Sequence, residues 1–181
     1  MCSGEYFGGV ISSDFVNRGY GVGGVDFLSD KARTIGPVDW VISNPWFSDD
    51  GTEKFVLRAL DVTKVGVAVF TRLQWLESVG RYERLFRDNP PTLIAFFAER
   101  VPLHKGTWKP EGRTATAYVW LIWVKGVAPL PPFWIPPGQR KALTRPDDIE
   151  RFNNAPIVKE IDSEDAAEVS ITPAQVPEAA A

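Results

Sequence analysis

The sequence predicts an α/β fold with a mostly parallel, doubly wound sheet, because apolar strand-like runs alternate with segments of helical spacing. Val65 to Phe70 is a continuous apolar run, as is typical of parallel strands that are buried on both faces. Ala117 to Val124 is also strongly strand-forming. No clear helix separates it from the preceding strand candidate, which indicates an antiparallel hairpin at one edge of the sheet.

The first third of the chain contains three strand candidates. Gly9 to Ser13 is a short apolar run that ends at Asp14, and Val25 to Leu28 follows a glycine-rich stretch. Val38 to Ser43 is the clearest candidate, because it is apolar, contains β-branched residues and is stopped by Asn44-Pro45. A proline cannot continue a central strand, so the chain must turn there.

Two helices are expected among the later strands. Glu53 to Val62 has apolar residues at helical spacing, and Thr52 is its expected N-cap. Val79 to Asp88 carries the second helical pattern, which Asn89-Pro90-Pro91 ends. Thr92 to Phe97 then follows as a further strand.

Composition divides the chain into three parts. Residues 1–126 hold all the expected strands and helices. Residues 127–146 are rich in proline, which cannot build a helix or a sheet, so we expect an extended connection there. Residues 147–181 are acidic and then rich in Ala, Pro and Glu, which is typical of a mostly disordered tail.

Charge and rare residues exclude several classes of protein. The 181 residues carry a formal net charge of −3. The chain therefore lacks the overall positive charge that indicates nucleic-acid binding, although its charges are unevenly placed. Cys2 is the single cysteine and His104 the single histidine, so a disulfide or a zinc site is not expected, and a reducing, cytoplasmic setting fits. No apolar run reaches the length of a membrane span, and no signal peptide is recognised.

The strongest chemical signal is Ser43-Asn44-Pro45-Trp46-Phe47, directly after a buried strand. Ligands of open α/β sheets bind beyond the carboxyl ends of the strands. The side-chain oxygen of Asn44 and a carbonyl at Pro45 can accept from an exocyclic amine, and Phe47 can stack on a base. Two acceptors draw electron density onto the amine nitrogen, as its methylation requires. Taken alone, the segment fits a proline turn with core aromatics equally well.

In its context, this segment resembles the catalytic region of class I methyltransferases that act on amino nitrogens, especially small phage and prophage DNA adenine-N6 enzymes. Their signature is Asn or Asp, Pro, Pro, then Tyr or Phe, and here Trp46 stands at the second proline. The resemblance covers roughly Tyr6 to Lys125. It implies a Rossmann-like catalytic domain, S-adenosyl-L-methionine as cofactor and DNA as substrate, with Asn44, Pro45 and Phe47 as catalytic residues.

The resemblance also assigns the cofactor side of the site. Ile11-Ser12-Ser13-Asp14 resembles a strand whose acidic end binds the ribose hydroxyls of the cofactor. Asp26-Phe27-Leu28 resembles a segment in which the aspartate accepts from the cofactor's adenine amine and the phenylalanine packs on the ring. Taken singly, Asp14 fits a turn and Asp26 a surface charge, but their order and spacing before the motif favour the functional interpretation.

The first strand and the glycine loop of the family are missing from the region of resemblance. In these enzymes the backbone N–H groups of the loop approach the methionine end of the cofactor. Gly8-Gly9 and Gly21 to Gly24 are no substitute, because neither follows a strand and opens a helix. We expect an upstream segment or a partner chain to complete the cofactor site.

Further residues are expected to contact DNA. Arg72 and Trp75 resemble a segment that lines the target-base pocket, which Trp46 would join. His104 and Lys105 lie in a polar, basic loop before the last strand, where charges can contact phosphates. Three helix arginines either extend this basic rim or form a solvated face: Arg81, Arg84 and Arg87.

Three functions follow as alternatives. The first is S-adenosylmethionine-dependent methylation of adenine N6 in DNA, with the adenine flipped out of the duplex. The second is a catalytically inactive methyltransferase remnant that acts as a nucleic-acid or protein binding module. The third keeps the amine methylation and moves it to RNA bases or to glutamine side chains of proteins.

Overall fold

The computed structural model describes residues 7–17, 21–29, 32, 37–45, 50–103, 112, 114–148 and 150. The described residues up to Phe27 belong to one compact unit, and those from Leu28 onward belong to a second unit. All helices and strands among the described residues belong to the second unit.

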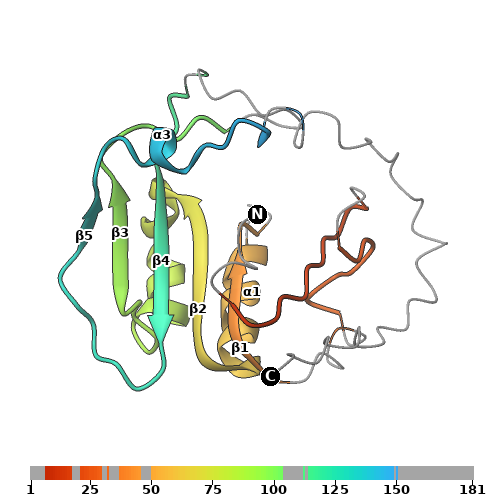
Figure 1. The fold of residues 1–181 in the computed structure, drawn as a ribbon. Coiled ribbons are helices and arrows are strands. Elements are labelled where there is room, and N and C mark those ends of the chain that lie inside the picture. The colour runs from red at the N-terminus through yellow and green to blue at the C-terminus, as the bar shows by residue number, and fades with distance from the viewer. Residues whose placement is uncertain are drawn as a thin grey trace, which may run out of the picture. The chain divides into compact units, whose positions relative to one another are not determined.

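A five-stranded sheet organises the second unit, with the strand order β1-β2-β4-β3-β5 (Figure 1). The strand β1 is parallel to β2, and β3 is parallel to β5, whereas β4 is antiparallel to both β2 and β3. Four of the five strands therefore run in one direction, which confirms an α/β fold with a mostly parallel sheet. The strands are β1 (Val38–Ser43), β2 (Thr63–Arg72), β3 (Leu93–Phe97), β4 (Tyr118–Val124) and β5 (Phe133–Ile135).

The antiparallel hairpin is confirmed, but its position in the sheet differs from the expected edge. The strands β3 and β4 pair from Leu93–Ile122 to Phe96–Val119. β4 lies between β2 and β3, and β5 takes the edge. A central position suits β4 because its seven residues are all apolar or aromatic, and every second one is buried.

The proline-rich residues 127–146 contain both a strand and a helix, so the expectation that they build neither was wrong. The strand β5 pairs with β3 from Ala95–Phe133 to Phe97–Ile135. Prolines flank these three residues and leave their N–H groups intact, and proline is tolerated next to an edge strand. The helix α3 (Gln139–Leu143) begins after Gly138, whose φ of +88° suits glycine.

The strand candidates Gly9 to Ser13 and Val25 to Leu28 do not form strands. Their region contains an isolated parallel bridge between Ser13 and Val22. Two backbone hydrogen bonds hold it: Asp14 N to Val22 O at 3.0 Å and Val22 N to Ser12 O at 2.8 Å. Ile11 is 63% exposed and Phe15 is 68% exposed, so burial adds little to stabilise a strand there.

The helix α1 (Gly51–Val62) confirms the first expected helix, although it begins two residues earlier. Its N-cap is Asp50, whereas the expected N-cap, Thr52, is fully buried in the first turn. Asp50 instead pairs with Lys54 one turn later, Oδ2 to Nζ at 2.7 Å. Both residue types are good caps, so the pattern alone does not separate them.

The second expected helix is present in a less regular form. A 3₁₀ turn, η3 (Leu73–Leu76), precedes the short α-helix α2 (Val79–Arg81) and the π-helical turn η4 (Tyr82–Phe86). The hydroxyl of Ser78 caps the start by accepting from the backbone N–H of Arg81 at 3.3 Å. The helical segment therefore ends two residues before the expected Asp88.

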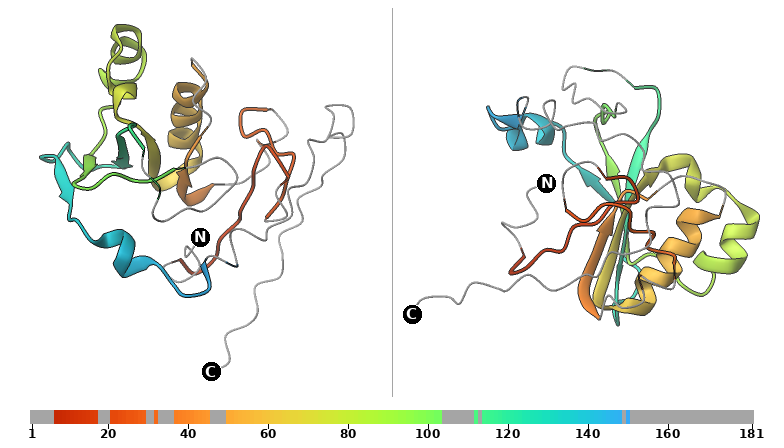
Figure 2. Two further views of the ribbon diagram at one scale, coloured as in Figure 1. Left: turned by 90° about the horizontal axis from the view of Figure 1, so that it is seen from above. Right: turned by 90° about the vertical axis from the view of Figure 1, so that its right-hand side faces the viewer.

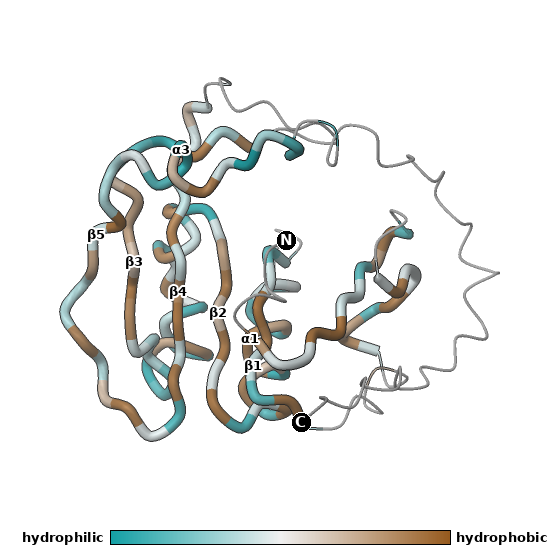
Figure 3. Tube along the Cα trace, in the orientation of Figure 1, coloured by the Kyte–Doolittle hydropathy of each residue, from teal (hydrophilic) through white to brown (hydrophobic). Residues whose placement is uncertain are grey.

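Helices cover one face of the sheet. Figure 2 shows α1 and the α2–η4 segment on the same side of the strands, with the short α3 on the other side. Strand residues that face α1 and η4 have no exposed surface: Val67, Val69, Val119 and Leu121. Figure 3 shows hydrophobic residues along most of β3.

The opposite face of the sheet holds an open apolar groove of about 410 Å³. A parallel sheet normally has helices over both faces. Among the described helices only α3, of five residues, lies on this side, so a doubly wound arrangement is not present in the described part of this unit. The groove is lined by Ile42, Ala68, Leu93, Ala95, Trp120, Ile122, Phe133 and Ile135.

Candidate functional site

The carboxyl ends of β1, β2 and β3 lie at one edge of the sheet, which we call the carboxyl edge. β4 runs in the opposite direction, so its first residue, Tyr118, lies at the same edge and pairs with Arg72 at the end of β2. Ligands of open α/β sheets bind beyond this edge. The side chains there are therefore the first candidates for a functional site.

Asn44 is exposed directly after β1, and Pro45 is buried. Ser43, the last residue of β1, pairs with Val69 of β2, so the sheet fixes the backbone just before the motif. The exposed side chain of Asn44 is not part of the core and is accessible to a ligand. Trp46 and Phe47 lie outside the described residues.

The three expected cofactor residues belong to the first unit, whereas Asn44 belongs to the second. Asp14 is exposed, and its Oδ1 accepts from the backbone N–H of Val16 at 3.0 Å. This bond is typical of the turn aspartate that was the alternative interpretation of Asp14. Asp26 is exposed and Phe27 is half-buried.

The two expected DNA contacts after β2 differ in exposure. Arg72 is exposed at the end of the strand. Trp75 is only 8% exposed, and its ring packs edge-to-face against Phe86, with centroids 5.6 Å apart. Trp75 therefore packs in the interior, and little of its ring is accessible for stacking on a base. His104 and Lys105 lie outside the described residues.

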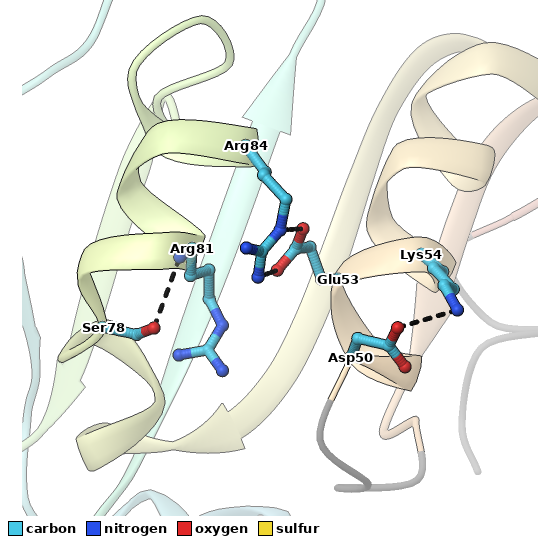
Figure 4. Close-up of polar contacts among 6 residues, drawn as sticks. All are labelled: Asp50, Glu53, Lys54, Ser78, Arg81 and Arg84. Atoms are coloured by element: carbon cyan, nitrogen blue, oxygen red, sulfur yellow. Dashed lines mark hydrogen bonds and ion pairs between the residues drawn. The ribbon is translucent and has the colours of Figure 1, made fainter.

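Two of the three helix arginines pair with carboxylates. Arg84 holds Glu53 with two hydrogen bonds, Nε to Oε1 at 2.7 Å and Nη2 to Oε2 at 3.0 Å (Figure 4). Hydrogen bonding to Glu53 and its negative charge raise the pKa of Arg84. Arg87 pairs with Asp88 at 3.2 Å, which raises the pKa of Arg87. These ion pairs offset the positive charge that a basic rim would need.

Arg81 is held by Trp75 rather than by a carboxylate hydrogen bond. Its Nη1 donates to the Trp75 carbonyl, and its guanidinium carbon lies 4.4 Å from the centroid of the indole. Burial lowers the pKa of Arg81, and the positive charge of Arg84 acts in the same direction, whereas the charge of Glu53 opposes both. Arg81 therefore fixes the turn before the helical segment.

A cavity of about 240 Å³ opens at the carboxyl edge, between the end of β3 and the start of β4. We call it the β3–β4 pocket. The sequence did not indicate it, because its two walls come from chain segments that only the hairpin brings together. Its described lining is Phe97, Ala98, Glu99, Arg100, Val101, Ala117 and Tyr118.

Aromatic rings support the β3–β4 pocket. Phe70 stacks on Tyr118, with centroids 5.0 Å apart and an interplanar angle of 13°. Phe97 meets the same Phe70 ring edge-on at 5.9 Å, and Trp120 does so at 5.3 Å. Because Phe70 is only 8% exposed, these contacts fix the rings of the two lining aromatics from the sheet side.

Two charged residues line the same pocket. Arg100 donates from Nη1 to the carbonyl of Ala115 at 3.0 Å, which ties the segment after β3 to the segment before β4. Glu99 is half-buried, and among the described residues its carboxylate has no hydrogen bond or ion pair. The pocket therefore combines an anchored guanidinium, an available carboxylate and aromatic walls.

The described residues contain neither a candidate metal site nor a candidate membrane span. No cluster of three or more His, Cys, Asp or Glu there could hold a metal ion. No described helix combines the length and the hydropathy that crossing a bilayer requires. Comparisons with protein-family models, with curated proteins and with solved structures found no match.

Proposed function

We propose that this chain transfers a methyl group from S-adenosyl-L-methionine to N6 of adenine in DNA. The observation that carries the proposal is the exposed Asn44 at the carboxyl edge, directly after a parallel strand and before the buried Pro45. A polar side chain at this edge is accessible to ligands, as sites in open α/β sheets are. Because one fold can host many unrelated functions, this site, rather than the sheet, supports methyl transfer.

In the proposed reaction, the chain holds and polarises the target amine. The side-chain oxygen of Asn44 accepts one amine hydrogen, and a backbone carbonyl at Pro45 accepts the other. Proline has no N–H, so the turn presents acceptors to the amine. The nitrogen becomes more electron-rich, and its proton leaves readily after alkylation, without a strong base.

The described residues of the first unit fit the adenosine half of the cofactor. Asp14 and Asp26 are exposed carboxylates, which can accept from ribose hydroxyls and from the adenine amine. Phe27 is half-buried and offers a ring on which adenine can pack. S-adenosyl-L-methionine supplies an electrophilic methyl group when it is bound.

A partner chain can add a strand and a glycine loop beside β1. The outer edge of β1 has no partner strand among the described residues. Unpaired backbone groups at a strand edge are a template for another strand. Ile42 of β1 is 41% exposed beside the apolar groove, so an added strand and helix would bury both.

A specific observation favours the second candidate, a non-catalytic binding module. The first unit, which holds the expected cofactor residues, contains an isolated bridge rather than strands among its described residues. A cofactor site built at the ends of two strands would then lack its support. This candidate predicts nucleic-acid or protein binding without measurable affinity for the cofactor.

Transfer of a tritiated methyl group to DNA tests the proposal. We expect transfer by the full unmodified chain, and a loss of at least about 100-fold in Asn44→Ala, because one preorganised acceptor is removed. Asn89→Ala is the matched control, because Asn89 precedes β3 at the opposite edge, and its backbone carbonyl keeps the bond to Trp123 Nε1.

The molecule that receives the methyl group distinguishes the alternative functions. Transfer to single-stranded RNA or to a glutamine peptide, but not to DNA, would move the reaction to that substrate. Calorimetry that detects no S-adenosylmethionine binding, together with retained DNA binding, would favour the non-catalytic module. Transfer that survives Asn44→Ala would remove the proposed role of this residue.

A further inference from the structure

The β3–β4 pocket is not used by the proposed methyl transfer, yet it lies at the same edge of the sheet as Asn44. Its volume of about 240 Å³ is below the roughly 300–1,000 Å³ of ordinary small-molecule pockets. It therefore suits a fragment of a larger ligand. The proposed function, on which this inference rests, supplies such a ligand, because a nucleic acid presents single bases.

The accessible surface of the pocket is mostly polar, and its lining also includes two aromatic rings. Tyr118 and Phe97 both line the pocket, and both are fixed by contacts with Phe70. Rings that are already held lose little conformational freedom when a ligand stacks on them. Stacking on aromatic side chains is a general way of holding unstacked bases.

The charged groups argue against a phosphate in this pocket. Arg100 alone would attract a phosphate, and one of its five N–H donors already binds the Ala115 carbonyl. Glu99 lines the same small space and would repel an anion there. A ligand that suits both residues must donate to the carboxylate and accept from the guanidinium.

Guanine is the common base whose edge matches this pair. Its N1–H and N2–H groups are adjacent donors that one carboxylate can accept together, and its O6 lies beside them as an acceptor. Adenine and cytosine place a ring acceptor next to the amine, which a carboxylate would repel. Thymine and uracil place acceptors on both sides of their single N–H group.

We propose that the β3–β4 pocket binds an unstacked guanine of the nucleic-acid substrate. Glu99 accepts from N1–H and N2–H, Arg100 donates to O6, and Tyr118 stacks on the ring. The strands β1 and β3 are separated by β2 and β4, which at about 4.8 Å per neighbouring pair places the pocket roughly 14 Å from Asn44. The guanine therefore lies within a few nucleotides of the target adenine.

Fluorescence anisotropy with labelled oligothymidylates of twelve nucleotides measures binding at this site independently of methyl transfer. The full chain is titrated with oligonucleotides that carry one central guanine, adenine or hypoxanthine. We expect guanine to be preferred over adenine by about five- to 150-fold, as for a bidentate base contact. Hypoxanthine lacks the 2-amino group and is expected to bind with intermediate affinity.

Variants assign the preference to the pocket. Glu99→Gln is expected to reduce the guanine preference to less than about twofold, because a neutral amide no longer accepts as strongly from both donors. Glu83→Gln, which removes an exposed carboxylate from η4, is the matched control and should keep the preference. Circular dichroism of both variants checks that a lost preference does not reflect unfolding.

The outcomes separate this inference from the proposed function. A guanine preference that persists in Asn44→Ala, while methyl transfer is lost, supports both. Methyl transfer by a chain that binds all three oligonucleotides equally overturns the guanine site alone. If all three oligonucleotides bind with equal affinity, and all bind equally more weakly to Arg100→Gln, then Arg100 contacts a phosphate and the guanine site is also overturned. A guanine preference without any methyl transfer supports the pocket and contradicts the proposed function.

Discussion

The guanidinium of Arg84 holds the carboxylate of Glu53 with two hydrogen bonds and thereby joins η4 to the first turn of α1 (Figure 4). The Glu53 side chain is 6% exposed, whereas that of Arg84 is 60% exposed. The two partners therefore differ in how deeply their charges are buried. Loss of Arg84 leaves the buried carboxylate of Glu53 without its partner, whereas loss of Glu53 leaves an arginine that water can solvate.

Replacing Arg84 should accordingly destabilise the protein more than replacing Glu53. We expect Arg84→Met to lower Tm by on the order of 5 °C and Glu53→Gln to lower it by less. Thermal unfolding followed by circular dichroism measures both. Equal losses, or a larger loss in Glu53→Gln, would show that the pair is solvated on both sides.

The Thr92 hydroxyl forms a hydrogen bond with the last residue of β4. It accepts from the backbone N–H of Val124 at 2.8 Å, and Thr92 is 4% exposed. Thr92→Val keeps the shape but leaves that N–H unpaired, so we expect a loss of about 1–3 kcal/mol in the free energy of unfolding. Urea denaturation measures it. Thr144→Val, at an exposed hydroxyl after α3, is the control and should change little.

Gly66 lies where two neighbours approach the backbone of β2. A Cβ atom there would meet the carbonyl oxygen of Trp123 at 2.4 Å and the ring of Trp40 at 2.8 Å. We expect Gly66→Ala to cost about 1–3 kcal/mol or more, because a paired carbonyl cannot move freely. Gly9→Ala, which meets nothing within 4 Å, is the control. Equal stability of the two variants would contradict the close approach.

The carboxyl group of Asp50 should titrate below its usual pKa of 3.8, because Lys54 donates a hydrogen bond to it and places a positive charge nearby. A lowered folded-state pKa stabilises the protein above the unfolded-state pKa, and this stabilisation is lost as the pH falls through the folded-state value. Carbon-detected NMR titration should show the Asp50 pKa rising in Lys54→Met. Since both groups are exposed, high salt should raise it as well.

The sequence predicts best those elements that carry their own signal. The apolar run of β2 and the periodicity of α1 both lead to elements that the structure confirms within two residues. The exposed Asn44 also lies between a strand and a proline, as the sequence indicates, but the expectation that this strand is buried was wrong, because none of the six residues of the edge strand β1 is buried. In each case neighbouring residues along the chain are enough to define the local environment.

The elements that were not predicted depend on distant partners. The strand β5 has three residues between prolines and forms because β3 offers an edge. The candidate strand at Gly9 has no such edge among the described residues, and its side chains remain exposed. Glu99 and Tyr118 form one pocket only because the hairpin brings the end of β3 to the start of β4. Local patterns carry no information about such pairings.

The insertion of β4 between β2 and β3 also sets an order for assembly. Gly66 of β2 pairs with Val124 of β4, so most of the second unit must leave the ribosome before the two strands can meet. Until then, β2 exposes an apolar, unpaired edge to other nascent chains. Long-range pairing of this kind slows folding. The last central strand to be synthesised thus closes the sheet, and a chain that stopped after β3 would leave β2 open to aggregation.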